Sequence, residues 1–305
     1  MRRITKVVWG VLAAVLLIAV VALFVAESRY QFLFAAPRKS HSTQINERTS
    51  ILAVVNPTLA MPLIRDRLGE NAPAQWALAS VLPYEAALLV SPDVQLGPVE
   101  VRLFVNARRL APVLVEESVN AAIPESVPFV TWTSRGFQRV GPGVLTMTGF
   151  TDIDRATLRE VKAEWGTVTL PSRPAIEGSH MLEAVIDNRD GALYAVVSAL
   201  AAKNLFELPV QKEVIRKTLA PVATVRAAGD LDGVDTLSIR LTVACQAAAE
   251  EGQVTTVSFA LGALLNELAK ALQQAYGATL TIGQKTTEGT SVTVECSLSN
   301  FRRIF

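Results

Sequence analysis

The longest uninterrupted apolar run of the chain lies near its start. Residues 7–26 contain no charged side chain and lack the polar face that an amphipathic surface helix presents. A helix of this length spans about 30 Å, which is the thickness of the hydrocarbon core of a bilayer. The pattern therefore predicts a transmembrane helix, with Trp9 and Tyr30 near its ends at the two membrane interfaces.

A cleaved signal peptide is the alternative interpretation of this run. The apolar core of a signal peptide has about 7–15 residues, and cleavage after Ala26 would leave Phe24 where a small residue is required. We therefore expect the run to be retained as an anchor. Arg2, Arg3 and Lys6 precede it, so the positive-inside rule predicts a single-pass protein of the cytoplasmic (inner) membrane, with its N-terminus inside and its body periplasmic or extracellular.

The pattern that follows residue 49 occurs twice. Segments 82–105 and 220–243 align without a gap, which places Arg102 opposite Arg240 and keeps the apolar positions in phase. In both segments apolar and polar residues alternate with a period of two, as in a strand with one buried and one exposed face. Each segment therefore predicts a hairpin.

Similar elements flank both hairpins. A short apolar strand precedes each one, and a second hairpin follows it, at 129–150 and 278–298. The predicted helices are 74–81 and 107–122 in the first copy and 210–219 and 254–276 in the second. The expected fold is α+β: after the transmembrane helix, the unit β-α-α-β-β-α-β-β occurs twice as duplicated modules, with antiparallel sheets covered by helices. The expected organisation is a cytoplasmic stub (1–6), the transmembrane helix (7–26), a tether (27–49), a first module (50–152), a connector (153–179) and a second module (180–305).

Composition excludes several function classes. Hydrophobic residues make up 50% and charged residues 19%, which is too apolar for a disordered chain. The 29 basic and 28 acidic side chains give a net charge of +1, without the basic excess of a nucleic-acid binder. Two Cys and two His are too few for a Cys/His zinc site. We find no P-loop, no dinucleotide-binding glycine turn and no G-x-S-x-G motif, so we expect no cofactor.

The two cysteines, Cys245 and Cys296, both lie near the ends of predicted strands, on the apolar phase of the alternation. An exported compartment permits a disulfide between them if their strands are neighbours and their Cα atoms lie within about 7 Å. The alternative is a pair of buried free thiols that pack as small hydrophobic side chains. Both interpretations are compatible with the sequence.

An Asp-rich segment between the two strands of the second hairpin is a weak candidate for a metal site. Asp230, Asp232 and Asp235 offer the oxygen ligands that Ca²⁺ prefers, but the order of an EF-hand loop is absent. Asp-Gly is also the commonest dipeptide of tight hairpin turns. We therefore favour a plain turn. The aligned Arg102 and Arg240 lie at polar positions of their predicted strands, so we expect both side chains to be solvated.

Taken together, these features favour a membrane-anchored extracytoplasmic protein that is not an enzyme. We expect it to act as a binding or scaffold component of a bacterial envelope assembly, with the lipid bilayer and an envelope protein as its partners. The first alternative is a carrier of an apolar ligand or lipid, because sheets backed by Ala-rich helices can enclose a cavity. The second alternative is a hydrolase whose site is assembled from residues distant in the sequence.

Overall fold

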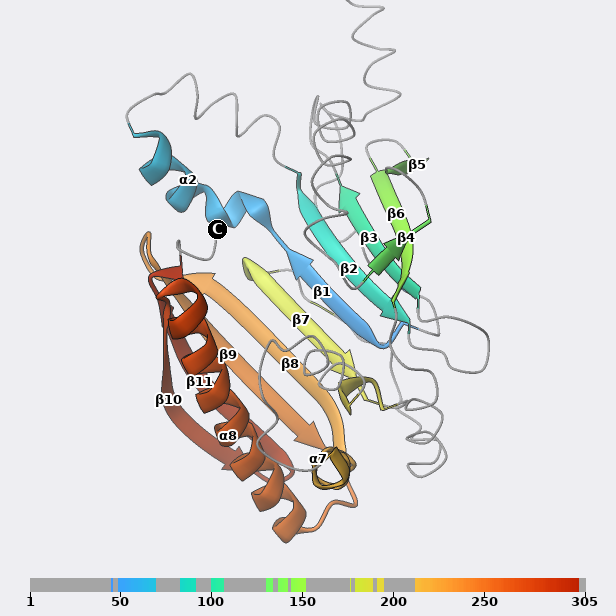
Figure 1. Ribbon diagram of the computed structural model, residues 1–305, viewed down its shortest axis with the longest axis vertical. Coiled ribbons are helices and arrows are strands. Elements are labelled where there is room, and N and C mark those ends of the chain that lie inside the picture. The colour runs from blue at the N-terminus through green and yellow to red at the C-terminus, as the bar shows by residue number, and fades with distance from the viewer. Residues whose placement is uncertain are drawn as a thin grey trace, which may run out of the picture.

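Antiparallel strands dominate the computed structural model of the chain (Figure 1). The structure describes residues 45, 49–69, 83–91, 100–106, 130–133, 137–141, 144–151, 176, 179–188, 191–194 and 212–301. Its strands form one 11-stranded sheet in the order β10-β11-β9-β8-β7-β1-β2-β3-β6-β4, with β5 also paired to β6. The described chain is therefore a mixed α/β fold in which a large antiparallel sheet carries few helices.

The first half of the chain supplies one side of this sheet. Pro57 and Pro62 lie in the first turns of its two helices, where the missing N–H breaks no helical hydrogen bond. The elements of this half are β1 (Ile51–Val55), the 3₁₀ helix η2 (Pro57–Ala60), α2 (Met61–Leu68), β2 (Glu85–Ser91), β3 (Glu100–Asn106), β4 (Val130–Trp132), β5 (Gln138–Gly141) and β6 (Val144–Thr151).

The second half supplies the other side and the longest helix. That helix, α8, begins with a capping box, in which the Gln253 side chain accepts a hydrogen bond from the backbone N–H of Glu250, and it ends at Gly277 in the left-handed conformation. The elements of this half are β7 (Leu182–Asp187), α7 (Lys212–Leu219), β8 (Val222–Leu231), β9 (Thr236–Cys245), α8 (Glu251–Tyr276), β10 (Thr279–Glu288) and β11 (Ser291–Ser299).

The two halves meet at the centre of the sheet, where β1 pairs with β7 (Figure 1). Leu52 lies opposite Val185, and the backbone N–H of Asn56 and of Asp187 extend the pairing through hydrogen bonds of 2.7 Å to Met181 and Ser50. Outward from this pair, β2-β3-β6 follows on one side and β8-β9-β11 on the other. Where the sequence predicts a sheet in each module, the structure joins the strands of both halves in one sheet.

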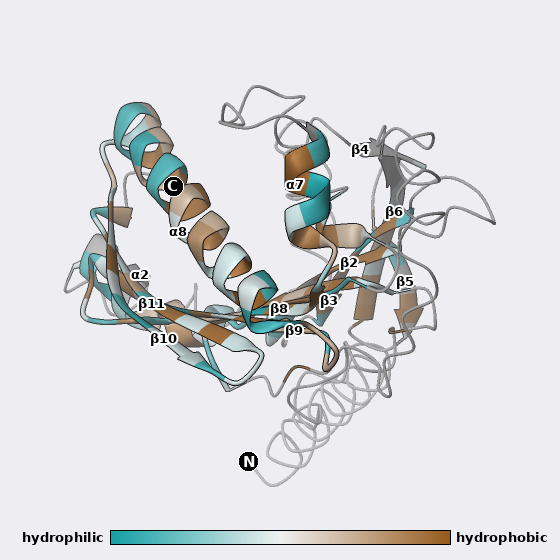
Figure 2. Ribbon diagram, turned by 90° about the horizontal axis from the view of Figure 1, so that it is seen from below, coloured by the Kyte–Doolittle hydropathy of each residue, from teal (hydrophilic) through white to brown (hydrophobic). Residues whose placement is uncertain are grey.

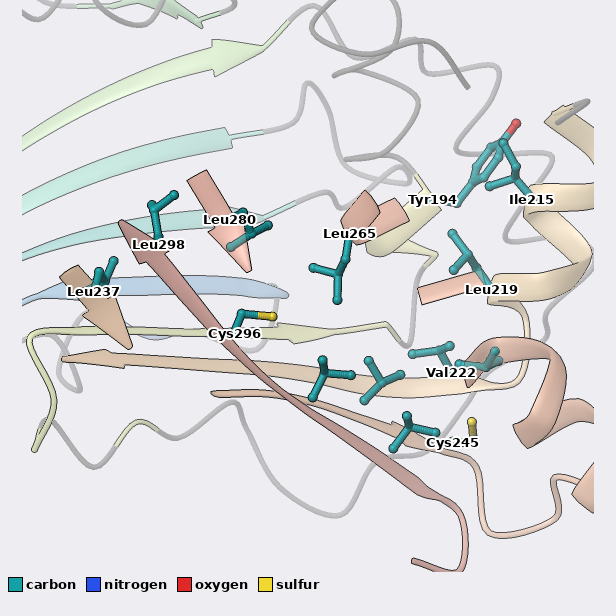
Figure 3. Packing of buried hydrophobic residues seen from close by; sticks show 14 of the residues in the cluster. Tyr194, Ile215, Leu219, Val222, Leu237, Cys245, Leu265, Leu280, Cys296 and Leu298 are labelled. Carbon is teal, nitrogen blue, oxygen red and sulfur yellow. The ribbon is translucent and has the colours of Figure 1, made fainter. Parts of the chain in front are cut away.

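Helices α7 and α8 lie on the same side of the sheet (Figure 2). The largest cluster of buried apolar residues lies between these helices and the second half of the sheet (Figure 3). Within it, Val292 and Val294 of β11 are fully buried, and Val254, Val257 and Leu265 of α8 are the apolar residues that the helix buries. Their spacing matches the apolar face that the sequence predicts for 254–276.

A second cluster lies on the opposite face of the central strands. Leu52, Ala87, Phe104 and Val185 belong to it, and partly buried Ile176 packs against it. Because side chains alternate along a strand, the neighbours of these residues face the helix side. On β1 and β7 the residues of this cluster are buried, whereas residues of the helix side, such as Ala53 and Ala184, are only partly buried.

Several predicted elements lie in the described part of the chain, and they are confirmed there. The helix predicted at 254–276 begins three residues earlier, at Glu251, and the last hairpin turns at Gly289, where φ is +56°. No helix of the described part is long and apolar enough to cross a membrane. The predicted anchor 7–26 with Trp9 and Tyr30, and the predicted helices 74–81 and 107–122, lie outside the described residues.

Candidate functional site

The second half of the sheet carries a hollow on each of its faces. On the helix side, a cavity of about 250 Å³ lies between α8 and strands β8 and β9; we call it the apolar groove. Every side chain that lines it is apolar. The lining includes Leu219, Val225, Leu241, Ala260, Leu264 and Leu268.

The apolar lining of the groove follows from the alternation of side chains along β8 and β9 and from the helical spacing of leucines along α8. Ala227 pairs with Leu241 and Val225 with Val243, so β8 and β9 present one apolar face to the helix side. Leu261, Leu264 and Leu268 follow one another along α8 at helical spacing. Because α8 packs chiefly along β10, its apolar face leaves a space over β8 and β9 that none of the described side chains fills. Leu268 is 43% exposed, so the groove opens to the surface at this end.

On the opposite face of the same strands lies a larger hollow of about 470 Å³, which we call the polar hollow. The sheet register explains its composition: Asp230 pairs with Ser238 and Ser238 with Ser297, and Arg240 pairs with Glu295 in the adjacent row. All these side chains project away from α8 because they occupy the alternate phase to the buried residues. His180, just before β7, completes the wall.

His180 and Asp230 form a hydrogen-bonded pair in the polar hollow. The Nδ1 atom of His180 lies 2.5 Å from Oδ2 of Asp230, and the backbone N–H of Met181 donates to Oδ1 of the same carboxylate at 2.9 Å. Oε1 of Glu183 accepts hydrogen bonds from the backbone N–H of Ser179 at 2.6 Å and of His180 at 2.9 Å. These bonds fix the turn that holds the imidazole.

The pair shifts the pKa of both partners. The hydrogen bond to Asp230 raises the pKa of His180, with further help from the negative charges of Asp230 and Glu183; partial burial and the positive charge of Arg240 oppose the shift. Burial alone would raise the pKa of Asp230, but the bonds from His180 and Met181 outweigh it and lower that pKa. Each group therefore stabilises the charged form of the other.

A second ion pair lies beside the first. Arg240 donates to Glu295 across the β9–β11 pair at 2.9 Å, and the two side chains are 68% and 56% exposed. At that exposure the pair contributes little to stability. The sequence predicts a solvated Arg240; in the structure it also lines the polar hollow.

The Asp-rich segment forms the turn between β8 and β9. The backbone N–H of Asp232 donates to the carbonyl oxygen of Thr236 at 2.8 Å, and Gly233 has a φ of +80°. Asp230 is held by His180 and Met181 rather than turned toward Asp232 and Asp235. Across the described ranges, no group of three or more His, Cys, Asp or Glu side chains is arranged to hold a metal ion.

The suggested disulfide between Cys245 and Cys296 is wrong in this structure. Their strands are neighbours, but Cys296 lies opposite Ile239, six residues from Cys245 along β9. At about 3.3 Å per residue the two Cα atoms are about 20 Å apart, far beyond the reach of a disulfide. Both thiols are free and buried, well separated in Figure 3, and burial raises the pKa of each.

Nothing in the sequence around His180 indicates its partner. Asp230 lies 50 residues away in the chain, so no local motif joins the two. The pairing follows from the register of β7 against β8, in which Leu182 lies opposite Gly229. Given that register, the histidine before β7 necessarily lies beside the end of β8.

Comparisons with known proteins add little to this picture. No protein-family model matches the sequence, and no curated protein matches it. Among solved structures, crystal form I of TP0453 gives a TM-score of 0.36 at 12% identity, covering 84% of this chain and 91% of that chain. Crystal form III of TP0453 gives a TM-score of 0.39 at 12% identity, covering 83% and 92%. Similarity at this level does not establish a shared fold or function.

Proposed function

We propose that the chain is a membrane-anchored, exported binding protein whose folded body holds an apolar ligand, an acyl chain, in the apolar groove. The observation that carries this proposal is the groove itself: a cavity of about 250 Å³ lined only by apolar side chains. Of the functions expected from the sequence, the carrier of an apolar ligand agrees best with this geometry. The envelope protein partner and the hydrolase alternative stay predictions.

The chemistry of the walls selects the ligand class. The groove offers no hydrogen-bonding side chain, so a polar ligand would lose its bonds to water without replacement. A hydrocarbon chain loses none and gains about 0.8 kcal/mol for each methylene that it buries. The cavity is smaller than the roughly 300–1,000 Å³ of a drug-sized site, which favours a slender chain over a bulky ring system.

Two features of the sequence support the same proposal. The predicted anchor would keep the body beside a bilayer, which is a constant source of acyl chains. The proposed duplication agrees with the order of strands, which is the same on both sides of the β1–β7 pair. On this proposal one ancestral unit was doubled, and the second copy carries the ligand site.

A photoreactive fatty acid tests the proposal on the full chain in detergent. We expect diazirine-bearing palmitate to label peptides of α8 and β9, in addition to any labelling of residues 7–26, because the probe enters the groove. Ala260→Phe places a ring in the groove and should reduce the labelling of α8 and β9 several-fold. Asn266→Phe adds the same ring to an exposed position of the same helix and should leave the labelling unchanged.

The outcome that contradicts the proposal is labelling of α8 and β9 that is equal in wild type and Ala260→Phe. Labelling confined to the N-terminal segment would contradict it equally, because the probe would then report only the membrane-spanning region. Far-ultraviolet circular dichroism of both variants shows whether the fold is kept. Mass spectrometry of the crosslinked peptides locates the labelled residues.

A further inference from the structure

The polar hollow is the larger of the two cavities, and the apolar ligand makes no use of it. Its volume of about 470 Å³ lies within the roughly 300–1,000 Å³ of ligand sites. We propose that this hollow binds a neutral polyhydroxylated ligand, a saccharide unit, through His180, Asp230, Arg240 and Glu295. The site lies on the face of β8 and β9 opposite the apolar groove, so the inference does not depend on the proposed acyl chain.

Two ion pairs link the four charged side chains of the hollow. Asp230 fixes the imidazole of His180 at 2.5 Å and is itself fixed by the backbone N–H of Met181 at 2.9 Å. Arg240 donates a hydrogen bond of 2.9 Å to Glu295, and both of these side chains are largely exposed. A site whose polar groups are ordered before binding loses less side-chain entropy when the ligand arrives. The arrangement is therefore suited to a ligand that needs several hydrogen bonds in fixed directions.

The charges of the hollow favour a neutral ligand over an anion. A phosphate or carboxylate near His180 and Arg240 would also face the carboxylates of Asp230 and Glu295, which lie on the same wall. A hydroxyl group can donate to a carboxylate and accept from a guanidinium at once, and such charge-assisted bonds are the stronger kind. The hydroxyls of Ser238 and Ser297 add further donors and acceptors on the same wall.

The first half of the sheet offers an internal comparison. Arg102, the residue aligned with Arg240, bonds instead to Glu100 of its own strand at 2.5 Å and is only 26% exposed. The residue aligned with Asp230 is Pro92, which has no carboxylate. The carboxylate of Asp230 thus has no counterpart at the aligned position of the first half, and Arg102 serves as a matched control for Arg240.

Saturation-transfer NMR on the full chain tests the inference, in micelles of a detergent without a sugar headgroup. The probes are chitotriose and maltotriose as neutral saccharides and inorganic phosphate as an anion. We expect saturation transfer to at least one trisaccharide at millimolar concentration. The affinity should fall by about tenfold or more in Arg240→Gln and in His180→Gln, since bonds to charged groups are removed. It should stay unchanged in Arg102→Gln.

Three results would overturn the inference. The first is that neither trisaccharide shows saturation transfer. The second is that wild type and Arg240→Gln bind the trisaccharides with equal affinity. The third is that phosphate binds with higher affinity than both saccharides. Both glutamine substitutions in the hollow are at partly exposed positions, so circular dichroism should show an unchanged fold. Labelling by the photoreactive fatty acid should be unaffected by these substitutions, which separates this test from that of the apolar groove.

Discussion

The His180–Asp230 pair makes the stability of the protein depend on pH through two opposite shifts. The raised pKa of His180 stabilises the fold fully below the unfolded value of about 6.5, and this contribution is lost as pH rises through the folded value. The lowered pKa of Asp230 stabilises the fold above about 3.9, and this contribution is lost as pH falls through its folded value. The pair contributes most between these two limits.

Replacing His180 should therefore change how the melting temperature depends on pH. In His180→Gln we expect the decline of the melting temperature above about pH 6.5 to flatten, since the charged partner of Asp230 is gone. His41→Gln removes the only other histidine of the chain and should keep the wild-type profile. Thermal unfolding followed by circular dichroism from pH 5 to pH 8 measures both; parallel profiles for wild type and His180→Gln would contradict the assignment.

Two phenylalanines differ sharply in what they contribute to stability. Phe104 is fully buried in the central strands, whereas Phe259 of α8 is 79% exposed. We expect Phe104→Ala to lower the free energy of unfolding by about 3–5 kcal/mol, because it leaves a cavity in a packed core. Phe259→Ala should change it by no more than about 0.5 kcal/mol. Urea titrations of the two variants make the comparison, and similar losses would contradict the placement of Phe104.

At the scale of elements, the residues that end a helix contribute to the free energy of unfolding. The C-terminus of α8 is an example. Gly277 has a φ of +67° and donates its N–H to the carbonyl oxygen of Gln273. Gly277→Ala should cost about 1–2 kcal/mol, because a Cβ is disfavoured in the left-handed conformation. Gly262→Ala lies within the same helix and has no atom within 4 Å of its new Cβ, so it should stabilise by about 0.5–1 kcal/mol.

The two glycine variants thus have opposite expected signs within one helix. Melting temperatures of the two proteins, compared with wild type, give the signs directly. A Gly277→Ala protein as stable as wild type would show that the helix does not end in the left-handed conformation. A destabilised Gly262→Ala protein would show that the space beside that position is filled.

Individual elements of the second half follow closely from the sequence. The apolar spacing of Val254, Val257, Leu261 and Leu265 defines the buried face of α8, and Gly277 marks its end. The alternation in β9 shows which side chains are buried. Periodicity reports the face of a strand but not its neighbour, so the β1–β7 pair and the contact of His180 with Asp230 could not be predicted. The polar hollow depends on that register, and it was missed for the same reason.

At the scale of the whole molecule, the continuous sheet couples the two halves. All four tryptophans precede residue 180, whereas α8, the longest helix of the described chain, lies in the second half. We expect tryptophan fluorescence and far-ultraviolet circular dichroism to give the same urea midpoint, because the core cluster of Leu52, Phe104 and Val185 is shared by the two halves across the β1–β7 pair. Ala184→Pro removes a donor from this centre and should lower both midpoints together. Two separate midpoints in wild type would contradict a single cooperative unit.

The central position of β1 also has a consequence for how the protein is made. The chain is synthesised from its N-terminus, so β1 and β2 can pair long before β7 exists. Until β7 arrives, the free edge of β1 exposes unpaired backbone groups of an apolar strand, a known template for aggregation. A truncated product that stops before β7 is therefore at risk of self-association, and a chaperone that shields this edge during synthesis would protect the nascent chain.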